Sequence, residues 1–163
     1  MNENQLWNRT IGQKKWPYGE TLYFWDHSDK YGFLSNWYPC TFTVGTRDFN
    51  CVEQYMMFRK AKVANYDSHI WDAVKLDIVM VGLVSKFSQD RGLYTLLMAT
   101  KDMYLVEASP HDNIWGIGLN EQQCVEYTKT WHISSDGGSR KPFGKNLLGK
   151  LLCYVRDDLF RSI

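Results

Sequence analysis

The sequence predicts a single α+β domain, mainly helical, with a small antiparallel sheet formed largely by its N-terminal third. Its 163 residues are the length of one ordinary domain. Strand-like patterns come first and helical spacing of apolar residues follows from Cys51 onward, without a repeating strand–helix–strand order. No linker rich in Pro, Gly or Ser divides the chain. We therefore expect one domain spanning residues 1–163.

The N-terminal third is predicted to form strands. Residues 20–25 are rich in side chains that favour β-structure, and Cys40, Phe42 and Val44 alternate on one face of a second stretch. The expected elements are an irregular arm at 1–19, a strand at 20–25, a polar loop at 26–36, and a hairpin of 38–44 and 47–49 that turns at Gly45-Thr46.

The remaining chain is predicted to be helical, apart from a short apolar strand at 105–108. Residues 121–142 are polar and contain Asp136-Gly137-Gly138-Ser139, which favours a surface excursion. The predicted helices carry these apolar stripes: Val52, Tyr55, Met56, Arg59 and Val63; Ile70, Val74, Ile78 and Val81; Leu93, Leu96 and Leu97 after a cap near Asp90; and Leu148, Leu151, Leu152, Val155 and Leu159 after Asn146.

Composition excludes several classes of protein. Nineteen basic against eighteen acidic residues leave a net charge of +1, which excludes nucleic-acid binding driven by bulk charge. The four cysteines lack zinc-ligand spacing, and the most apolar run, 78–84, is too short to span a membrane. No signal peptide is visible, so we expect a cytoplasmic protein without a membrane partner. Aromatic residues make up 15% of the chain, which suits a rigid core or a pocket that stacks flat rings.

Two groups of residues are candidates for chemistry. Glu53 and Lys60 are seven residues apart on a predicted helix, so both lie on one face, with Met56 and Met57 between them. They either share the wall of a pocket, as a catalytic carboxylate and a lysine, or lie at the rim and extend into solvent.

The second group follows the strand at 105–108. A turn containing Pro110 and Asp112 leads to Trp115, which is followed by Gly116 and Gly118, whose backbone N–H groups could approach a phosphate. The alternative is an Asx turn that caps a buried Trp115. No dinucleotide fingerprint, phosphate-binding loop or acyl-transfer triad is present. These patterns alone predict an α+β domain with an aromatic-rich polar pocket.

Five motifs, in order, resemble those of the NADAR family of YbiA-like N-glycosidases and together extend over about residues 21–160. The motifs are YGFLSNWYPC at 31–40, VEQYMMFRKA at 52–61, KFSQ at 86–89, LVEASPHDNIWGIG at 105–118, and GKNLLG at 144–149 with Arg156. The resemblance implies a YbiA-like domain that cleaves the N-glycosidic bond of a ribose-phosphate compound. Family substrates are phosphoribosylamino-pyrimidine intermediates of riboflavin synthesis or ADP-ribosylated guanine in nucleic acid.

The family's functional positions fall on Glu53, Trp71, Asp112 and Trp115, with Lys60 as the lysine of the glutamate helix. Carboxylates at Glu53 and Asp112 suit the positive charge that develops on the sugar, or proton transfer. Lys60 either pairs with phosphate or attacks the anomeric carbon as an amine. This chemistry requires no metal or redox cofactor, so we expect none. The predicted catalytic residues are Glu53, Lys60 and Asp112, and the predicted substrate-binding residues are Trp71 and Trp115 for stacking, Gly116, Gly118 and Arg59 for phosphate, and Asn36.

The sequence departs from the family pattern in three places. Gln54 replaces the usual histidine, Phe143 replaces a common tryptophan, and the segment between Lys60 and Trp71 is short. The excursion at 121–142 could supply a lid or contact nucleic acid through Lys129, Arg140 and Lys141. The alternative to an enzyme is a module that binds ADP-ribose or NAD without turnover, and the oligomeric state stays open.

Overall fold

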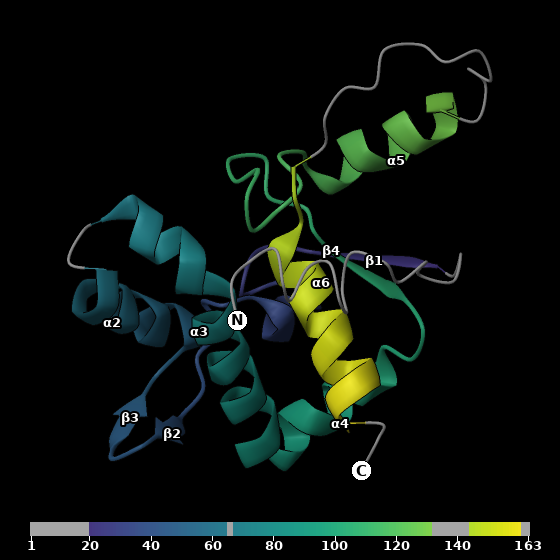
Figure 1. Cartoon of the computed structure of the whole chain (residues 1–163). Helices are drawn as coiled ribbons and strands as arrows, with labels where there is room; N and C mark the ends of the chain where they lie inside the picture. Colours follow the sequence, from purple (N-terminus) through teal and green to yellow (C-terminus); the bar gives the residue numbers. More distant parts are fainter. Residues whose placement is uncertain (1–19, 65–66, 132–143, 161–163) are drawn as a thin grey trace.

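The structure, a computed structural model, describes residues 20–64, 67–131 and 144–160 (Figure 1). The predicted arm at 1–19 and the Asp136–Ser139 turn lie outside these residues. Within them, no helix is long and apolar enough to cross a membrane. The elements are β1 (Thr21–Phe24), the 3-10 helix η2 (Gly32–Leu34), β2 (Phe42–Val44), β3 (Arg47–Phe49), α2 (Val52–Ala64), α3 (Ser68–Gln89), α4 (Arg91–Ala99), β4 (Tyr104–Glu107), α5 (Glu121–Trp131), α6 (Leu147–Tyr154) and the π-helical turn η3 (Val155–Phe160).

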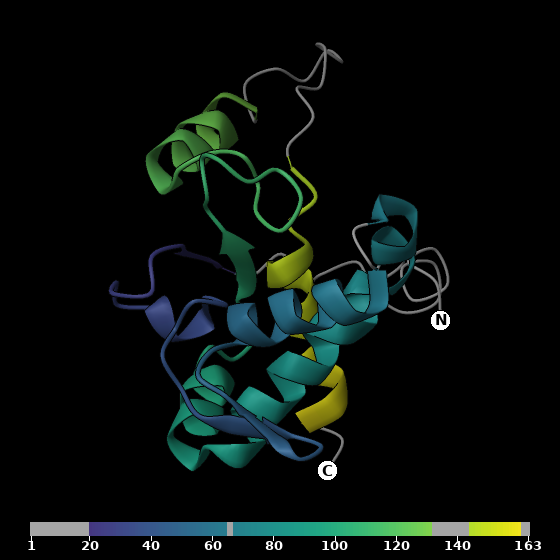
Figure 2. The same ribbon diagram turned by 90° about the vertical axis from the view of Figure 1, so that its left-hand side faces the viewer.

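The predicted α+β class is confirmed, and so is the antiparallel hairpin. In β2 and β3, Phe42 pairs with Phe49 and Val44 with Arg47, which places the two phenylalanine rings together on the core side. The first strand of the hairpin, β2, is shorter than the predicted 38–44, although the N–H of Cys40 still donates to the carbonyl of Asn50 at 2.9 Å. Figures 1 and 2 show α2 and α3 packed side by side, with the hairpin at one end of them.

The second strand pair corrects the expectation of a purely antiparallel sheet. β1 pairs with β4 in parallel, with Leu22 opposite Leu105 and Phe24 opposite Glu107. A parallel pair needs a long crossover, and the hairpin with α2, α3 and α4 provides it. This pairing brings the end of β4, and the loop that follows, beside the N-terminal third of the chain.

The polar stretch 121–142, predicted as a surface excursion, begins with the helix α5 at Glu121–Trp131, and residues 132–143 lie outside the described part of the chain. A reciprocal cap starts this helix: the Asn120 side chain accepts the N–H of Gln123 at 2.8 Å, and the Gln123 side chain accepts the N–H of Asn120 at 3.0 Å. On this helix, the side chain of Cys124 is buried. In Figure 1, α5 projects away from the other helices.

The inner face of α3 differs from the predicted stripe. Ile70 and Val81 are 45% and 43% exposed, whereas Lys75 and Lys86 are buried. Lys86 is satisfied there because its ammonium group donates to the carbonyl of Ser35 at 2.9 Å. A prediction of the buried helix face from apolar residues alone does not identify such buried lysines. Leu96 on α4 is likewise exposed, at 45%.

Aspartates cap both helices of the α3–α4 pair. Asp67 accepts the N–H groups of His69 and Ile70 at 2.8 and 3.3 Å, and Asp90 accepts that of Leu93 at 3.0 Å, which confirms the predicted cap.

We expect Asp67→Ala to lower the free energy of unfolding by about 1 kcal/mol, because it leaves two N–H groups of α3 without their acceptor. Urea denaturation measures this change. Asp67→Asn is the matched control, since an amide oxygen still accepts; equal losses in both variants would show that the cap hydrogen bonds are not responsible.

Candidate active site

Three segments meet where the predicted catalytic residues lie: the end of the 26–36 loop, the first turn of α2, and the 108–120 loop after β4. The N–H of Glu53 donates to the carbonyl of Asn36 at 2.9 Å, which docks the start of α2 on that loop. Glu53 is therefore held in the first turn of the helix and is partly buried.

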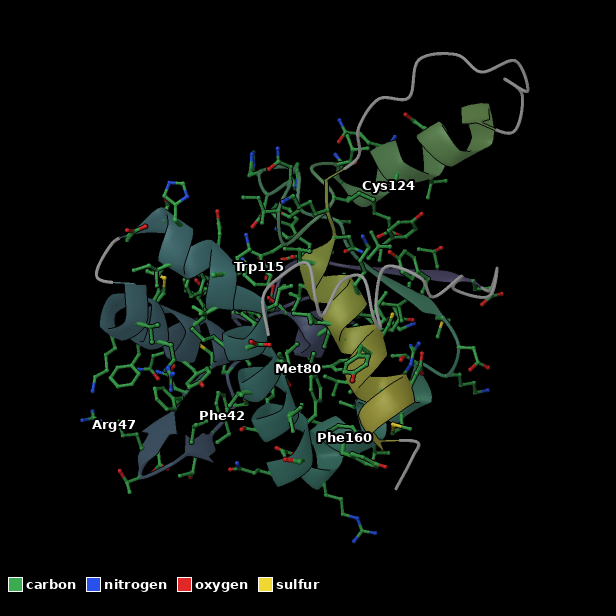
Figure 3. All side chains as sticks on the ribbon, viewed as in Figure 1. Phe42, Arg47, Met80, Trp115, Cys124 and Phe160 are labelled. Carbon is green, nitrogen blue, oxygen red and sulfur yellow. The ribbon has the colours of Figure 1, made fainter. Side chains whose placement is uncertain are left out.

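Asp112 organises the 108–120 loop. One of its carboxylate oxygens accepts the N–H groups of Ile114 and Trp115, at 2.7 and 2.8 Å. Trp115 is partly buried against the core and lies beside the first turn of α6 (Figure 3), where the N–H of Leu148 donates to its carbonyl at 3.1 Å. The Asx turn considered as an alternative is thus present. This turn holds the carboxylate of Asp112 near Glu53. Asp112 can therefore form the turn and also take part in the chemistry of the site.

Within the loop, the N–H groups of Ile117 and Gly118 are used by the fold, which bears on the predicted phosphate site. The N–H of Gly118 donates to the carbonyl of Asp112 and that of Ile117 to the carbonyl of Glu107, both at 2.9 Å, so neither is available to a ligand. The backbone at position 118 has a φ of +74°, a conformation that favours glycine. A side chain at Gly116 would lie 2.9 Å from the carbonyl oxygens of Asp112 and Glu107. Close packing therefore explains Gly116, and backbone conformation explains Gly118.

Three carboxyl groups act on one another at this site. Burial raises the pKa of Glu53, and the charge of Asp112 raises it further, while Lys60 lowers it. Burial, followed by the charges of Asp112 and Glu53, raises the pKa of Glu107 from its ordinary 4.5 to about 8. Burial and neighbouring negative charge therefore raise the pKa of Glu53 and of Glu107 alike, and only Glu53 has a nearby lysine that acts against the shift.

Lys60 and Trp71 form a pair at the other end of this face of α2. The Lys60 ammonium lies 5.3 Å from the centre of the Trp71 ring, which is a cation–π distance. Trp71 is only 9% exposed and belongs to the core. The ring predicted to stack on substrate is thus mostly covered, and it instead orients the lysine. Lys60 and Glu53 share one helix face, as predicted.

The structure separates the other two predicted binding residues. Asn36 is 5% exposed, and its side-chain oxygen has no hydrogen-bond partner among the described residues, which leaves an acceptor beside Glu53. Arg59 is not brought to this cluster. It lines a groove of about 330 Å³ between α2 and α3, together with Tyr55 and Asp77.

Glu107 was not selected from the sequence, although it is the last residue of β4, five positions before Asp112 in the same motif. Its N–H donates to the side-chain oxygen of Asn146 at 3.0 Å, and its carbonyl accepts the N–H of Ile117 at 2.9 Å. The carboxyl oxygen Oε2 is buried and has no partner in the described part of the chain. The sequence did offer one indication of Glu107: it is a carboxyl residue near the end of a predicted strand, just before a polar turn.

Within the described ranges no three potential ligands are grouped in a way that could hold a metal ion. A second groove, about 740 Å³ in volume, is lined by β1, the loop after it, Ala108 and the start of α5.

Comparison with known proteins assigns the class of this α+β domain. The model of the NADAR domain family matches residues 23–65 and 61–160, which is most of the chain. The chain belongs to the NADAR domain family.

Individual relatives agree with this assignment. The chain is 34% identical to the N-glycosidase R617 of Acanthamoeba polyphaga mimivirus, over 77% of this chain and 86% of that protein. It is 25% identical to the riboflavin biosynthesis protein VVA0006 of Vibrio vulnificus, over 86% of this chain but only 39% of that protein. The NMR structure of the E. coli protein YbiA superposes with a TM-score of 0.61 at 26% identity, covering 88% of this chain and 86% of that one.

Proposed function

We propose that this protein is an N-glycosidase that hydrolyses the bond between a ribose carbon and the nitrogen of a base in a phosphorylated ribosyl compound. One observation carries the proposal: Asp112 and Lys60 are both near enough to Glu53 to shift its pKa, and Lys60 shares the helix face of Glu53. The names of the similar proteins support the same reaction.

Cleavage of a ribosyl carbon–nitrogen bond places positive charge on the sugar carbon and its ring oxygen. Asp112 is the proposed fixed negative charge, since two backbone N–H groups hold one of its oxygens. Glu53 is the proposed base that takes a proton from the attacking water, and the start of α2 fixes its backbone. Trp115 and the unpaired oxygen of Asn36 are proposed to contact the base and the sugar.

We expect Lys60 to form a reversible imine with the aldehyde of the released, ring-opened sugar phosphate, with loss of water, because the lysine lies on the same face as Glu53 and is 5.3 Å from the Trp71 ring. Borohydride reduction during turnover should then add the mass of the sugar phosphate to the peptide that contains Lys60. The adduct should disappear in Lys60→Ala and persist in Lys62→Ala, an exposed lysine of the same helix. Turnover without an adduct in the wild type would leave Lys60 a phosphate-pairing role only.

The substrate is proposed to be either a phosphoribosylamino-pyrimidine or an ADP-ribosylated guanine in nucleic acid. Incubation with each compound, followed by chromatography of the free base and free ADP-ribose, distinguishes them. Release from one of the two is the expected result. If neither compound is cleaved while ADP-ribose binds in calorimetry, the protein is a binding module and the proposed enzyme activity is wrong.

A further inference from the structure

A third carboxyl group, that of Glu107, lies at the proposed site and has no assigned task. It follows Val106 at the end of β4, directly before the loop that carries Asp112. The charges of Asp112 and Glu53 both raise the pKa of Glu107, so all three carboxyl groups are near one another. A substrate held between Asp112 and Glu53 is therefore also close to Glu107.

We propose that Glu107 is the acid of this site: it gives its proton to the leaving nitrogen of the ribosyl substrate. This inference rests on the proposed N-glycosidase function and extends it to the second half of the reaction.

The backbone of Glu107 is held on both sides, which fixes the origin of its side chain. Its N–H is bonded to Asn146, a residue that is 3% exposed and whose amide also donates to the carbonyl of Leu105 at 3.0 Å. Its carbonyl is bonded to the N–H of Ile117, and the neighbouring Ala108 N–H donates to Phe24 at 2.8 Å. Such clamping suits a group that must deliver a proton in one direction.

The surroundings of the carboxyl favour the protonated form. Oε2 is buried and accepts no hydrogen bond from the described residues, which for a carboxylate would cost several kcal/mol. The titratable groups that act on it are Asp112 of the loop and Glu53 of α2, both negative when ionised, and the side chain of Asn146 on the remaining side is neutral. No described cation is among the groups that shift the pKa of Glu107, so the proton is retained near neutral pH.

The two proton transfers balance. The bond from sugar carbon to nitrogen breaks, its electron pair stays on the nitrogen, and the nitrogen takes the proton of Glu107. Water forms the new carbon–oxygen bond and gives a proton to Glu53. One proton then returns from Glu53 to Glu107 through solvent, and the net reaction is hydrolysis. The mechanism requires Glu107 to start protonated and Glu53 to start ionised; Lys60 lowers the pKa of Glu53, whereas no described cation is among the groups that shift the pKa of Glu107.

Glu107→Gln tests the proposal, because the amide keeps the shape and loses the transferable proton. Turnover should fall about 10²–10⁴-fold, and the alkaline decline of the kcat/KM profile near the pKa of about 8 should disappear. The loss should be smaller for a substrate whose base departs without protonation. Glu121→Gln, which removes an exposed carboxylate of α5, is the matched control and should retain wild-type turnover.

A second measurement needs no substrate. The folded-state pKa of Glu107 lies above the unfolded one, so its contribution to wild-type stability should be full below pH 4.5, decrease as pH rises from 4.5 to about 8, and level off above that, and Glu107→Gln should lack this decrease. The same pH dependence in both proteins would overturn the proposal, because Glu107 would then not hold a proton.

The kinetic outcomes separate the two claims. A wild type that turns over and a Glu107→Gln variant that turns over as fast as Glu121→Gln would also overturn the proposal, while leaving the N-glycosidase function intact. A wild type that cleaves neither substrate would instead show that the proposed function itself is wrong.

Discussion

We expect Glu53→Gln to lower turnover about 10²–10⁴-fold while leaving the protein folded. The amide has nearly the same shape, and the backbone bond that docks α2 on Asn36 is unaffected. It cannot accept the proton of water, and it removes a negative charge that stabilises the developing sugar cation. The measurement is the initial rate of base release at saturating substrate, with the same amount of folded protein in each assay.

Stability supplies the control for this variant. Because burial and Asp112 both raise the pKa of Glu53, its ionised form is unfavourable in the folded state, and the neutral amide should leave the unfolding midpoint unchanged or higher. If base release by the variant stays within about twofold of the wild type, well below the loss expected for a general base, Glu53 is not the base.

The second large effect concerns the structure that supports β4. Arg156 is 1% exposed, and its guanidinium donates to the hydroxyl of Thr100 at 2.9 Å and to the carbonyl of Met103 at 2.8 Å, while it pairs with Asp157. We expect Arg156→Met to lower the free energy of unfolding by about 3 kcal/mol, because Thr100, Met103 and Asp157 lose their bonds to the buried guanidinium.

Urea denaturation of this variant gives the answer directly, since a lower midpoint with an unchanged slope reports a loss of stability alone. Arg91→Met, at an exposed arginine of α4, controls for removal of a positive charge. A loss below about 1 kcal/mol in Arg156→Met, no more than an ordinary substitution causes, would mean that the buried guanidinium does not hold the start of β4 in place.

Local patterns were sufficient to predict the helix that carries Glu53 and Lys60, the hairpin, and the turn at Asp112. Each of these depends on residues close in sequence, such as the seven-residue spacing on one helix face. The parallel pairing of β1 with β4 was not predictable in this way, because it joins segments about 80 residues apart. The predicted antiparallel sheet therefore described the hairpin only.

The site was predicted in part, for a related reason. Glu107 became a candidate only when the fold showed its carboxyl oxygen buried near two other carboxylates. The glycine N–H groups and the Trp71 ring were predicted to face a ligand, but other parts of the fold use the Gly118 N–H and cover most of Trp71. The tertiary structure decides which hydrogen-bond partner a polar group has and whether an aromatic ring is covered. The spacing of residues in the sequence does not contain this information.

A single-turnover experiment tests the central claim most directly. Wild-type protein in excess over each candidate substrate is quenched at intervals, and mass spectrometry follows the intact N-glycoside, the free base and the sugar phosphate. For one of the two substrates, the account predicts complete conversion to free base with a single exponential time course. Recovery of both substrates intact from protein to which they are bound would contradict it.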